Sequence, residues 1–471
     1  IRDRSDPDKF DTVIQDILKK YYPDIQFKKS ELVWNYNFLK RKLTEAYSLK
    51  ESRLAKVYKN VEAEDLVGEI AKEITITDIT PETLTLDSGH YISNRTTRAV
   101  FWEAVENDRT IEFHLGEARE FVKNVEARGG EVLYEVNPMA RNYNKIFFVR
   151  YPGETEHRVA ITNIGGHDRL DHLVHQISLS NLSSKKIVNK VKIIGDLDDF
   201  HERLSRKIKG RLELLPKADR LVIGQKGAID GIFTLQWKKR ALQNLYAEDP
   251  DSVISAFDLD DSKIKEIIDG DGVISALDNK SKIEKAFAKV ESKFEAKPEL
   301  YPAKFKELEW DLNVAEMADY VFKNAEGKDV RWRVVSNVWG DEIVPVAKAL
   351  KELGQDNVTY IGTAGAFPDK GYKVGDLVIP SHYLDAKGKI KARGTPLEVE
   401  GAKVGGVVEH VASPFDETFQ WLSEASQRSD LVEIETNYLG RIFGAQNDHV
   451  RSYLLVSDIL GSEGETLASA S

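Results

Sequence analysis

Three acidic residues in the last part of the sequence have the type and the setting that acid–base chemistry needs. Glu433 and Glu435 stand two residues apart in the apolar segment LVEIE, and Asp458 ends the apolar run YLLVSD. Residues two apart in a strand share one face, so both glutamates are expected to face the same pocket. A run of buried-type residues that ends in an acid indicates a central parallel strand. Open α/β sheets place ligand sites at the carboxyl ends of such strands.

A stretch of small residues comes before these acids. Residues 360–380 read YIGTAGAFPDKGYKVGDLVIP. The pattern predicts a buried strand, a turn of little side-chain bulk at 362–366, and a second strand opened by residues 374–376. Backbone amides in such a turn can approach a ligand closely, and Thr363 can offer a hydroxyl. Packing alone is the alternative explanation for glycines at this place.

Four short motifs follow one another in this part of the chain: GTAG at 362–365, VGDLVI at 374–379, VEIE at 432–435 and VSD at 456–458. The ordered set resembles the nucleoside phosphorylase and nucleosidase superfamily, whose members cleave the N-glycosidic bond of nucleosides. The resemblance covers about residues 331–465. With it we expect an α/β protein that contains a three-layer α/β/α domain with a twisted mixed sheet. A fainter resemblance, of residues 157–177 to the opening strand and helix of AMP nucleosidases, points the same way.

The resemblance assigns roles to several acids of this sequence. Glu435 would hold the ribose by accepting hydrogen bonds from two neighbouring hydroxyls, with Glu433 and the Ile434 backbone lining the same pocket. Asp458 would be the catalytic acid that protonates or hydrogen-bonds the leaving base, a contribution of about 10²–10⁴-fold. The alternatives are a glutamate that faces solvent from a strand edge, and a helix N-cap at Asp458.

The same resemblance implies a set of residues around the base and sugar. Thr363, Ala364 and Gly365 would wrap the two rings. Phe415 lies in the segment 407–421, where such proteins have a strand and a loop, and it would stack on the base. An ordinary core phenylalanine is the alternative at this position.

The sequence departs from the family where phosphorylases bind inorganic phosphate with a serine and a glycine-rich turn. Residues 336–342 read SNVWGDE, with one glycine followed by Asp341 and Glu342. Carboxylates repel a phosphate dianion, and Trp339 is bulky. We therefore expect hydrolytic cleavage of the N-ribosidic bond of a purine nucleoside or nucleotide, with Asp341 or Glu342 as a candidate general base. The alternatives are phosphorolysis, and a non-catalytic nucleoside-binding or signalling module with the same fold.

The C-terminal end of the sequence bears on the choice between an enzyme and a non-catalytic module, and the N-terminal end bears on processing. The family continues with a further helix after the catalytic aspartate, and 13 residues follow Asp458 here. A missing helix would leave the pocket incomplete and favour the non-catalytic module, whereas a trimmed chain would not. The sequence starts at Ile1 without a methionine, and we expect that it has been trimmed or processed.

The composition limits the classes of protein. The sequence has 471 residues, 41% hydrophobic and 31% charged, which predicts two or three globular domains and no membrane-spanning run. The net charge of -11 disfavours nucleic acid and acidic membranes as partners. Cysteine is absent, so no disulfide or thiolate metal site is possible. We expect a small-molecule nucleoside or nucleotide as partner, possible homo-oligomers, no cofactor, and a cytoplasmic location, although a secreted protein without disulfides would look the same.

Two domains are expected along the chain. Residues 1–140 are predicted to form a mainly helical accessory domain, with helices at 10–22, 32–49 and 100–107. Residues 141–471 are predicted to form the nucleosidase-like domain, with an acidic helical insertion at 237–300.

Within the second domain several elements are predicted. Strands are expected at 146–151 and 331–340, and a strand at 157–166 is expected to lead into a helix. A further helix is expected at 314–324. Arg331 and Arg333 would share one face of the strand that opens the family-like region.

Two other clusters have the residue types of metal sites, although no metal site is predicted. The segment from His167 to His175 holds three histidines and two aspartates, which suits either a divalent metal or a solvated helix with intrahelical acid–base pairs. Residues 267–278 resemble part of a calcium-binding loop, but Ile267 stands where the first ligand is needed. A turn between two helices is the better explanation there.

Overall fold

In the computed structural model the chain forms two compact units. The first holds residues up to 216, residues 311–315 and residues from 337 onwards; the second holds residues 217–310 and 316–336. The described residues are 71–73, 100–101, 104–105, 107–136, 144–184, 191–269, 279–300, 306–311, 315–323, 327–355, 357–385, 388–391, 399, 401–417, 419–444 and 450–461. The helices predicted at 10–22 and 32–49 lie outside them, as do residues 270–278 of the calcium-loop resemblance at 267–278.

A six-stranded mixed sheet forms one part of the first unit, in the order β1-β6-β2-β5-β4-β3. Its strands are β1 (Ala71–Glu73), β2 (Ile111–Leu115), β3 (Glu131–Val136), β4 (Lys145–Arg150), β5 (Arg158–Ile164) and β6 (Val191–Ile194). β2 runs parallel to β5 and β6, whereas β3 and β4 form an antiparallel pair. The strands predicted at 146–151 and 157–166 are confirmed as β4 and β5.

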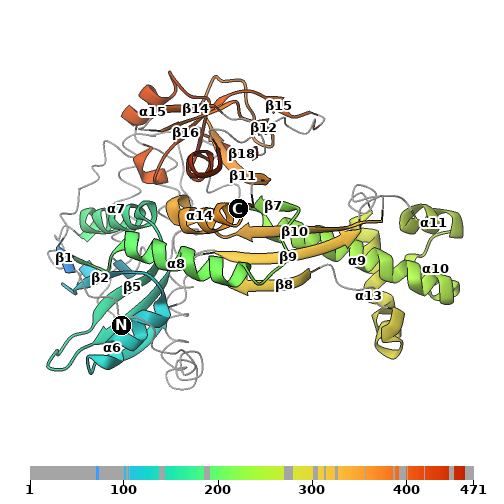
Figure 1. Ribbon diagram of the computed structural model, residues 1–471, viewed down its shortest axis with the longest axis horizontal. Helices are drawn as coiled ribbons and strands as arrows, with labels where there is room; N and C mark the ends of the chain where they lie inside the picture. Colours follow the sequence, from blue (N-terminus) through green and yellow to red (C-terminus); the bar gives the residue numbers. More distant parts are fainter. Residues whose placement is uncertain are drawn as a thin grey trace. The chain divides into compact units, whose positions relative to one another are not determined.

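Helices cover both faces of this sheet, which gives the three-layer α/β/α arrangement that was predicted. They are α6 (Ala118–Ala127), α7 (His167–Ser184) and α8 (Leu197–Leu212). Alternate residues of β4 point to opposite faces, so Phe147 packs with Phe121 of α6 while Phe148 packs in the cluster that holds Leu173 of α7. α6 and α7 accordingly lie on opposite sides of the strands (Figure 1).

Strands on both sides of residue 140, the expected end of the accessory domain, share this sheet. Residues 100–101 and 104–105 are helical, as predicted, but β2 pairs with β5 and β3 pairs with β4 across that boundary. Strand pairing between distant segments, which local helical spacing does not report, ties residues 111–136 to the sheet that follows them.

A second mixed sheet completes the first unit, with the order β14-β13-β16-β17-β11 and with β18, β12 and β15 continuing beyond β11. Its strands are β11 (Val358–Ala366), β12 (Leu377–Ile379), β13 (His382–Asp385), β14 (Gly388–Lys391), β15 (Lys403–Val404), β16 (Val407–His410), β17 (Leu431–Glu433) and β18 (Val450–Ile459). The helical segments are η3 (Gly340–Glu342), α14 (Ile343–Glu352), η4 (Pro414–Asp416), α15 (Phe419–Ala425), α16 (Thr436–Leu439) and η5 (Gly440–Gly444).

The small residues at 362–366 were predicted as a turn, and this prediction is wrong. They belong to β11, which pairs parallel with β18 along its whole length. The chain turns later, between Phe367 and Asp376, before β12. Small side chains are needed inside β11 because Tyr360 folds back over Gly362, where a β-carbon would lie 2.5 Å from its hydroxyl oxygen.

The second unit combines a sheet in the order β7-β10-β9-β8 with a group of helices. Its elements are β7 (Arg220–Ile223), α9 (Lys226–Glu248), α10 (Pro250–Phe257), α11 (Asp261–Asp269), α13 (Lys280–Ala296), η2 (Pro298–Leu300), β8 (Lys306–Asp311), β9 (Glu316–Lys323) and β10 (Asp329–Ser336). The described part of residues 237–300 is largely helical, and the strand predicted at 331–340 is found as β10, which ends at Ser336. Among the described helices, none is both long and apolar enough to cross a membrane.

The helix predicted at 314–324 is wrong, because this segment forms β9. It pairs antiparallel with β10 along eight residues, from Glu316 to Lys323. The pairing places Asp319 opposite Arg333, and the two buried side chains form an ion pair of 2.8 Å. Arg331 lies 3.3 Å from the same carboxylate. Cross-strand pairing has overridden the helical propensity of alanine, methionine and glutamate in this segment.

Candidate functional site

Gly365 of β11 joins three of the four sequence motifs. β17 lies on one side and opposes Val432 to Gly365, and β18 lies on the other side and opposes Asp458 to it. A β-carbon at Gly365 would meet Cγ1 of Val432 at 3.1 Å and Oδ2 of Asp458 at 3.2 Å. The GTAG, VEIE and VSD motifs therefore meet near the carboxyl ends of two parallel strands.

Asp458 is held in a setting that favours its protonated form. Its side chain is only 3% exposed, and the hydroxyl of Ser457 donates a hydrogen bond of 2.6 Å to Oδ1. Burial raises the pKa of Asp458 above its ordinary value, and the Ser457 hydrogen bond opposes this shift only in part. A carboxyl with a raised pKa can act as a proton donor near neutral pH.

Glu433 and Glu435 are bridged by one tyrosine. The hydroxyl of Tyr360 lies 2.5 Å from Oε1 of Glu433 and 3.0 Å from Oε2 of Glu435. Oε2 of Glu433 also accepts hydrogen bonds from the backbone N–H groups of Glu435 and Thr436, at 2.8 and 2.6 Å. All three bridged side chains are buried. The shared face expected of the two glutamates is thus occupied by a tyrosine.

The backbone turn at Gly340 supplies the other partner of Glu435. The Gly340 N–H donates a hydrogen bond of 2.7 Å to Oε1 of Glu435. Gly340 has a φ of 57°, in the left-handed region that glycine adopts without strain. Burial and the neighbouring Glu433 raise the pKa of Glu435 well above its ordinary value.

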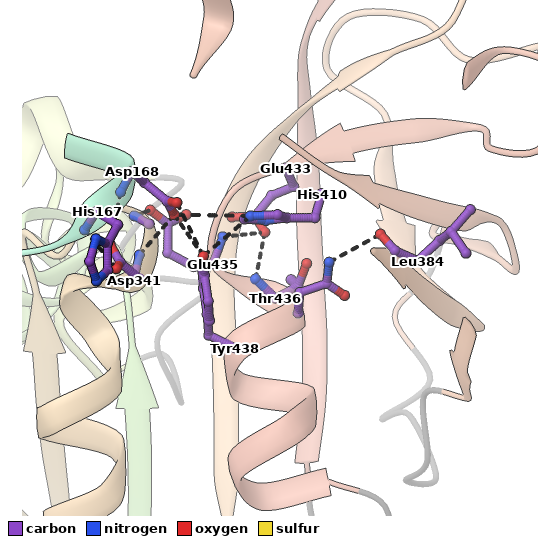
Figure 2. Close-up of polar contacts among 11 residues, drawn as sticks. His167, Asp168, Asp341, Leu384, His410, Glu433, Glu435, Thr436 and Tyr438 are labelled. Carbon is purple, nitrogen blue, oxygen red and sulfur yellow. Dashed lines mark hydrogen bonds and ion pairs between the residues drawn. The ribbon is translucent and has the colours of Figure 1, made fainter. Parts of the chain in front are cut away.

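Two aspartates lock this turn to the start of α7 (Figure 2). Asp341 accepts hydrogen bonds from the backbone N–H groups of His167 and Asp168, at 2.7 and 3.2 Å, and so caps the helix. In return the Asp341 N–H donates a hydrogen bond of 3.0 Å to Oδ2 of Asp168. Asp341 therefore acts as a helix cap, which leaves Glu342 as the stronger of the two predicted general bases.

Asp168 also reaches the segment that follows the VEIE motif. The hydroxyl of Tyr438, one helical turn after Glu435, donates to the Asp168 carboxylate at 3.0 Å, and Nε2 of His410 lies 4.0 Å from it. Figure 2 shows Asp168, Tyr438 and His410 pointing toward one another. Burial, followed by repulsion from Asp341, raises the pKa of Asp168 to about 8.

Glu342 is the most deeply buried acid of the turn, with 1% of its surface exposed. Its Oε1 accepts a hydrogen bond of 3.2 Å from the Gly165 N–H and lies 3.8 Å from Nε of Arg169. Among the described residues, no hydrogen-bond partner reaches Oε2. Burial raises the pKa of Glu342 to about 7, and Arg169, which stacks 4.3 Å above the ring of Trp339, opposes the shift. A carboxyl with these properties suits a general base at neutral pH.

In the segment considered as a possible metal cluster, the side chains of His172 and Asp168 form hydrogen bonds within the chain. His172 lies with Nδ1 3.0 Å from the Ser413 hydroxyl and with Nε2 2.9 Å from the side-chain amide of Gln176. Asp168 binds Asp341 and Tyr438, as described above. Within the described part of the chain, no group of three or more metal-ligating side chains is arranged to hold an ion.

The chain matches neither a protein-family model nor a curated protein sequence. Its similarity to solved structures is partial.

The solved structures to which the chain is similar include the following three nucleosidases and phosphorylases. One is the Arabidopsis thaliana 5′-methylthioadenosine nucleosidase in apo form: 18% identity, 33% of this chain and 76% of that one, TM-score 0.27. Another is the Colwellia psychrerythraea 5′-methylthioadenosine/S-adenosylhomocysteine nucleosidase in complex with adenine: 16% identity, 35% and 80% coverage, TM-score 0.27. The third is the Vibrio fischeri uridine phosphorylase: 21% identity, 34% and 70% coverage, TM-score 0.28. The likeness concerns the fold of about a third of the chain.

The residues predicted to wrap the sugar and base divide between the two faces of β11. Thr363 is exposed and lies opposite the half-exposed Leu455 of β18, whereas Ala364 is buried. Ile434 is partly exposed, just after the end of β17. Phe415 lies in η4, and its side chain is outside the described ones. Gly365 pairs with Asp458 of β18, so it is the member of the small-residue set that lies beside an acid.

The sequence reasoning missed Tyr360 and Tyr438, which link the acids. A local signal existed for both. Tyr360 precedes Gly362 by two residues on the same strand face, where the missing side chain leaves room for the ring. Tyr438 follows Glu435 by three residues, which places both on one side of a helical turn. Asp168 could not be linked to Asp341 from the sequence, because 173 residues separate them.

Proposed function

We propose that this protein cleaves the N-ribosidic bond of a purine nucleoside or nucleotide, with water as the nucleophile. The observation that carries the proposal is the junction at Gly365, which brings Val432 of the VEIE motif and Asp458 of the VSD motif to the carboxyl ends of parallel strands. Open α/β sheets bind ligands at such ends. The purine preference rests on the sequence resemblance alone.

Each step of the proposed reaction has a candidate residue. Asp458 would give its proton to the leaving base, for which a raised pKa is required. Glu342 would take a proton from the attacking water through Oε2. Glu435 would contact the ribose hydroxyls. Over one turnover Glu342 gains one proton from water and Asp458 loses one proton to the base, so the number of protons on the protein is unchanged.

The Gly340 turn supports hydrolysis over phosphorolysis. Backbone N–H groups of a turn bind phosphate when they are available. Here the N–H of Gly340 donates to Glu435 and the N–H of Asp341 donates to Asp168. Internal carboxyl groups thus hold the donors that a phosphate ion would need.

A second candidate function is nucleoside binding without turnover. It is favoured by one observation: the oxygens of Glu433 and Glu435 already accept hydrogen bonds from within the chain. A ribose would have to compete with these partners. Such a module would bind nucleosides and release no base.

The test is release of free base from a panel of purine nucleosides and nucleotides, with and without inorganic phosphate. Asp458→Asn is compared with the wild type, and Asp251→Asn, on an exposed position of α10, serves as the matched control. We expect release that is independent of phosphate, yields the free sugar, and falls about 10²–10⁴-fold in Asp458→Asn only.

Other outcomes would decide against the proposal. Sugar phosphate as the product, with phosphate-dependent release, would establish phosphorolysis. Ligand binding without base release in the wild type would establish the non-catalytic module. Equal release in Asp458→Asn and the wild type would remove Asp458 from the mechanism.

A further inference from the structure

The bridge between Glu433, Tyr360 and Glu435 contains too few protons if both glutamates are ionised. An ionised carboxylate only accepts hydrogen bonds, and a tyrosine hydroxyl has one proton to donate. Yet this hydroxyl lies within hydrogen-bond distance of both carboxyl groups, at 2.5 and 3.0 Å. One of the two contacts therefore needs a proton that comes from a glutamate.

The donors around each glutamate indicate which one carries that proton. Glu433 accepts from the N–H groups of Glu435 and Thr436 as well as from the closer contact with Tyr360. Both of its oxygens are thus engaged as acceptors. Glu435 has the longer contact with Tyr360 and one backbone donor, the N–H of Gly340, at its other oxygen. Its Oε2 is the oxygen that can carry a proton.

We propose that Glu435 is a neutral carboxylic acid that donates from Oε2 to Tyr360, while Tyr360 donates to an ionised Glu433. The three side chains then share one negative charge and form a chain of two hydrogen bonds in one direction. Tyr360 is the positioning residue that fixes the direction, because it accepts from one glutamate and donates to the other.

The surroundings of the pair agree with this assignment. The groups that shift the pKa of Glu435 are Glu433, Tyr360 and the Gly340 N–H, and none of them is a cation. Two carboxyl groups that share a buried site do not both ionise readily, since each charge repels the other. Burial and the two glutamates also raise the pKa of Tyr360 well above its ordinary value, which keeps its hydroxyl protonated.

A neutral Glu435 changes what the site can offer a ligand, a consequence that rests on the proposed function. A carboxylic acid has one proton to donate, so when that proton turns from Tyr360 to a ligand, Glu435 can pair with the oxygen of one ribose hydroxyl while its other oxygen accepts. A carboxylate could only accept. Glutamine, which is also neutral and also donates and accepts, would then be a fair substitute at position 435.

Infrared difference spectroscopy tests the protonation state without any substrate. A protonated carboxyl gives a C=O stretch that is separate from the bands of a carboxylate. The spectra are taken near neutral pH as a difference between the wild type and each variant, so that the protonated Asp168, whose pKa is raised to about 8, contributes equally to both and cancels. We expect an acid band in the wild type that is lost in Glu435→Gln. It should persist in Glu409→Gln, which replaces a buried glutamate paired with Arg428 at 2.6 Å.

Tyr360→Phe provides a second variant in case Glu435→Gln does not fold. Here we expect the acid band to remain and to shift, because the acid has lost its hydrogen-bond acceptor. The proposal is overturned if the Glu435→Gln difference spectrum contains only carboxylate bands, or if Tyr360→Phe leaves the acid band at its wild-type frequency.

Base release adds an independent readout. With a neutral Glu435, release in Glu435→Gln should fall by less than about tenfold, since the hydrogen-bonding capacity is kept. A loss of about 10²-fold or more would show that the ionised form is needed, and would contradict the proposal. If the wild type releases no base at all, the proposed function fails while the infrared result still decides the proton assignment.

Discussion

Asp168 and Asp341 each accept a hydrogen bond from the other's backbone N–H. The Asp341 N–H lies 3.0 Å from Oδ2 of Asp168, and the Asp168 N–H lies 3.2 Å from Oδ1 of Asp341. This reciprocal pair fastens the start of α7 to the Gly340 turn. It also brings two carboxylates together, and the repulsion between them contributes to the raised pKa of Asp168.

The close fit of this pair predicts that Gly166 tolerates no side chain. A β-carbon at Gly166 would overlap the carboxylate of Asp341, whereas one at Gly210 in α8 would meet nothing within 4 Å. We expect Gly166→Ala to lower the free energy of unfolding by about 1–3 kcal/mol or more, because Asp341 must move and its helix cap is lost. Gly210→Ala, as control, should be neutral or slightly stabilising. Denaturant unfolding measures both, and equal stability of the two variants would contradict the prediction.

Stability should fall with rising pH between about 6.5 and 8. In this window an unfolded Asp168 has lost its proton, since its ordinary pKa is 3.8, while the folded residue keeps it until about 8. The folded state therefore binds more protons, and the free energy of unfolding decreases with pH by up to about 1.4 kcal/mol per unit for this group. His157, whose pKa is lowered from 6.5 to about 4, acts in the opposite direction only below this window.

The variant Asp168→Asn isolates this contribution. It removes the titrating group while keeping an acceptor oxygen, so the slope of unfolding free energy against pH should become less steep. Asp251→Asn, on the exposed surface of α10, should keep the wild-type slope. Denaturant titrations at several pH values give the slopes, and identical slopes for Asp168→Asn and the wild type would refute the assignment.

These contacts show where sequence reasoning succeeds and where it stops. Local patterns predicted β4, β5 and β10 and the helical character of residues 237–300, because burial periodicity is a property of neighbouring residues. They failed for β9, whose strand form depends on its pairing with β10. The same limit hid the link between Asp168 and Asp341, which lie far apart in the sequence and meet only in the folded chain.

The Gly365 junction predicts a coupled loss of stability and activity. A β-carbon there would meet Leu460 at 2.9 Å, Val432 at 3.1 Å and Asp458 at 3.2 Å. We expect Gly365→Ala to destabilise the fold by about 1–3 kcal/mol and to displace the Asp458 carboxyl, which would slow base release even where the variant is fully folded. Gly227→Ala, a helical glycine with nothing within 4 Å, is the control for both assays. If the folded Gly365→Ala variant released base at the wild-type rate, the position of the Asp458 carboxyl would not matter for the reaction.

The buried Glu342 predicts the pH dependence of the proposed hydrolysis. A general base works in its ionised form, and the pKa of Glu342 is raised to about 7. Below that pH the residue is protonated and cannot accept a proton from water, so kcat/KM for base release should rise tenfold per pH unit up to about 7, and at higher pH it should fall once Asp458 has lost the proton that it gives to the base. Glu342→Gln should lose about 10²–10⁴-fold of the rate and should lose this limb of the profile. Glu352→Gln, at the exposed end of α14, should retain both. If Glu342→Gln lowers the rate but keeps a limb near pH 7, another group is the base, and Glu342 serves only to hold Gly165 and Arg169 in place.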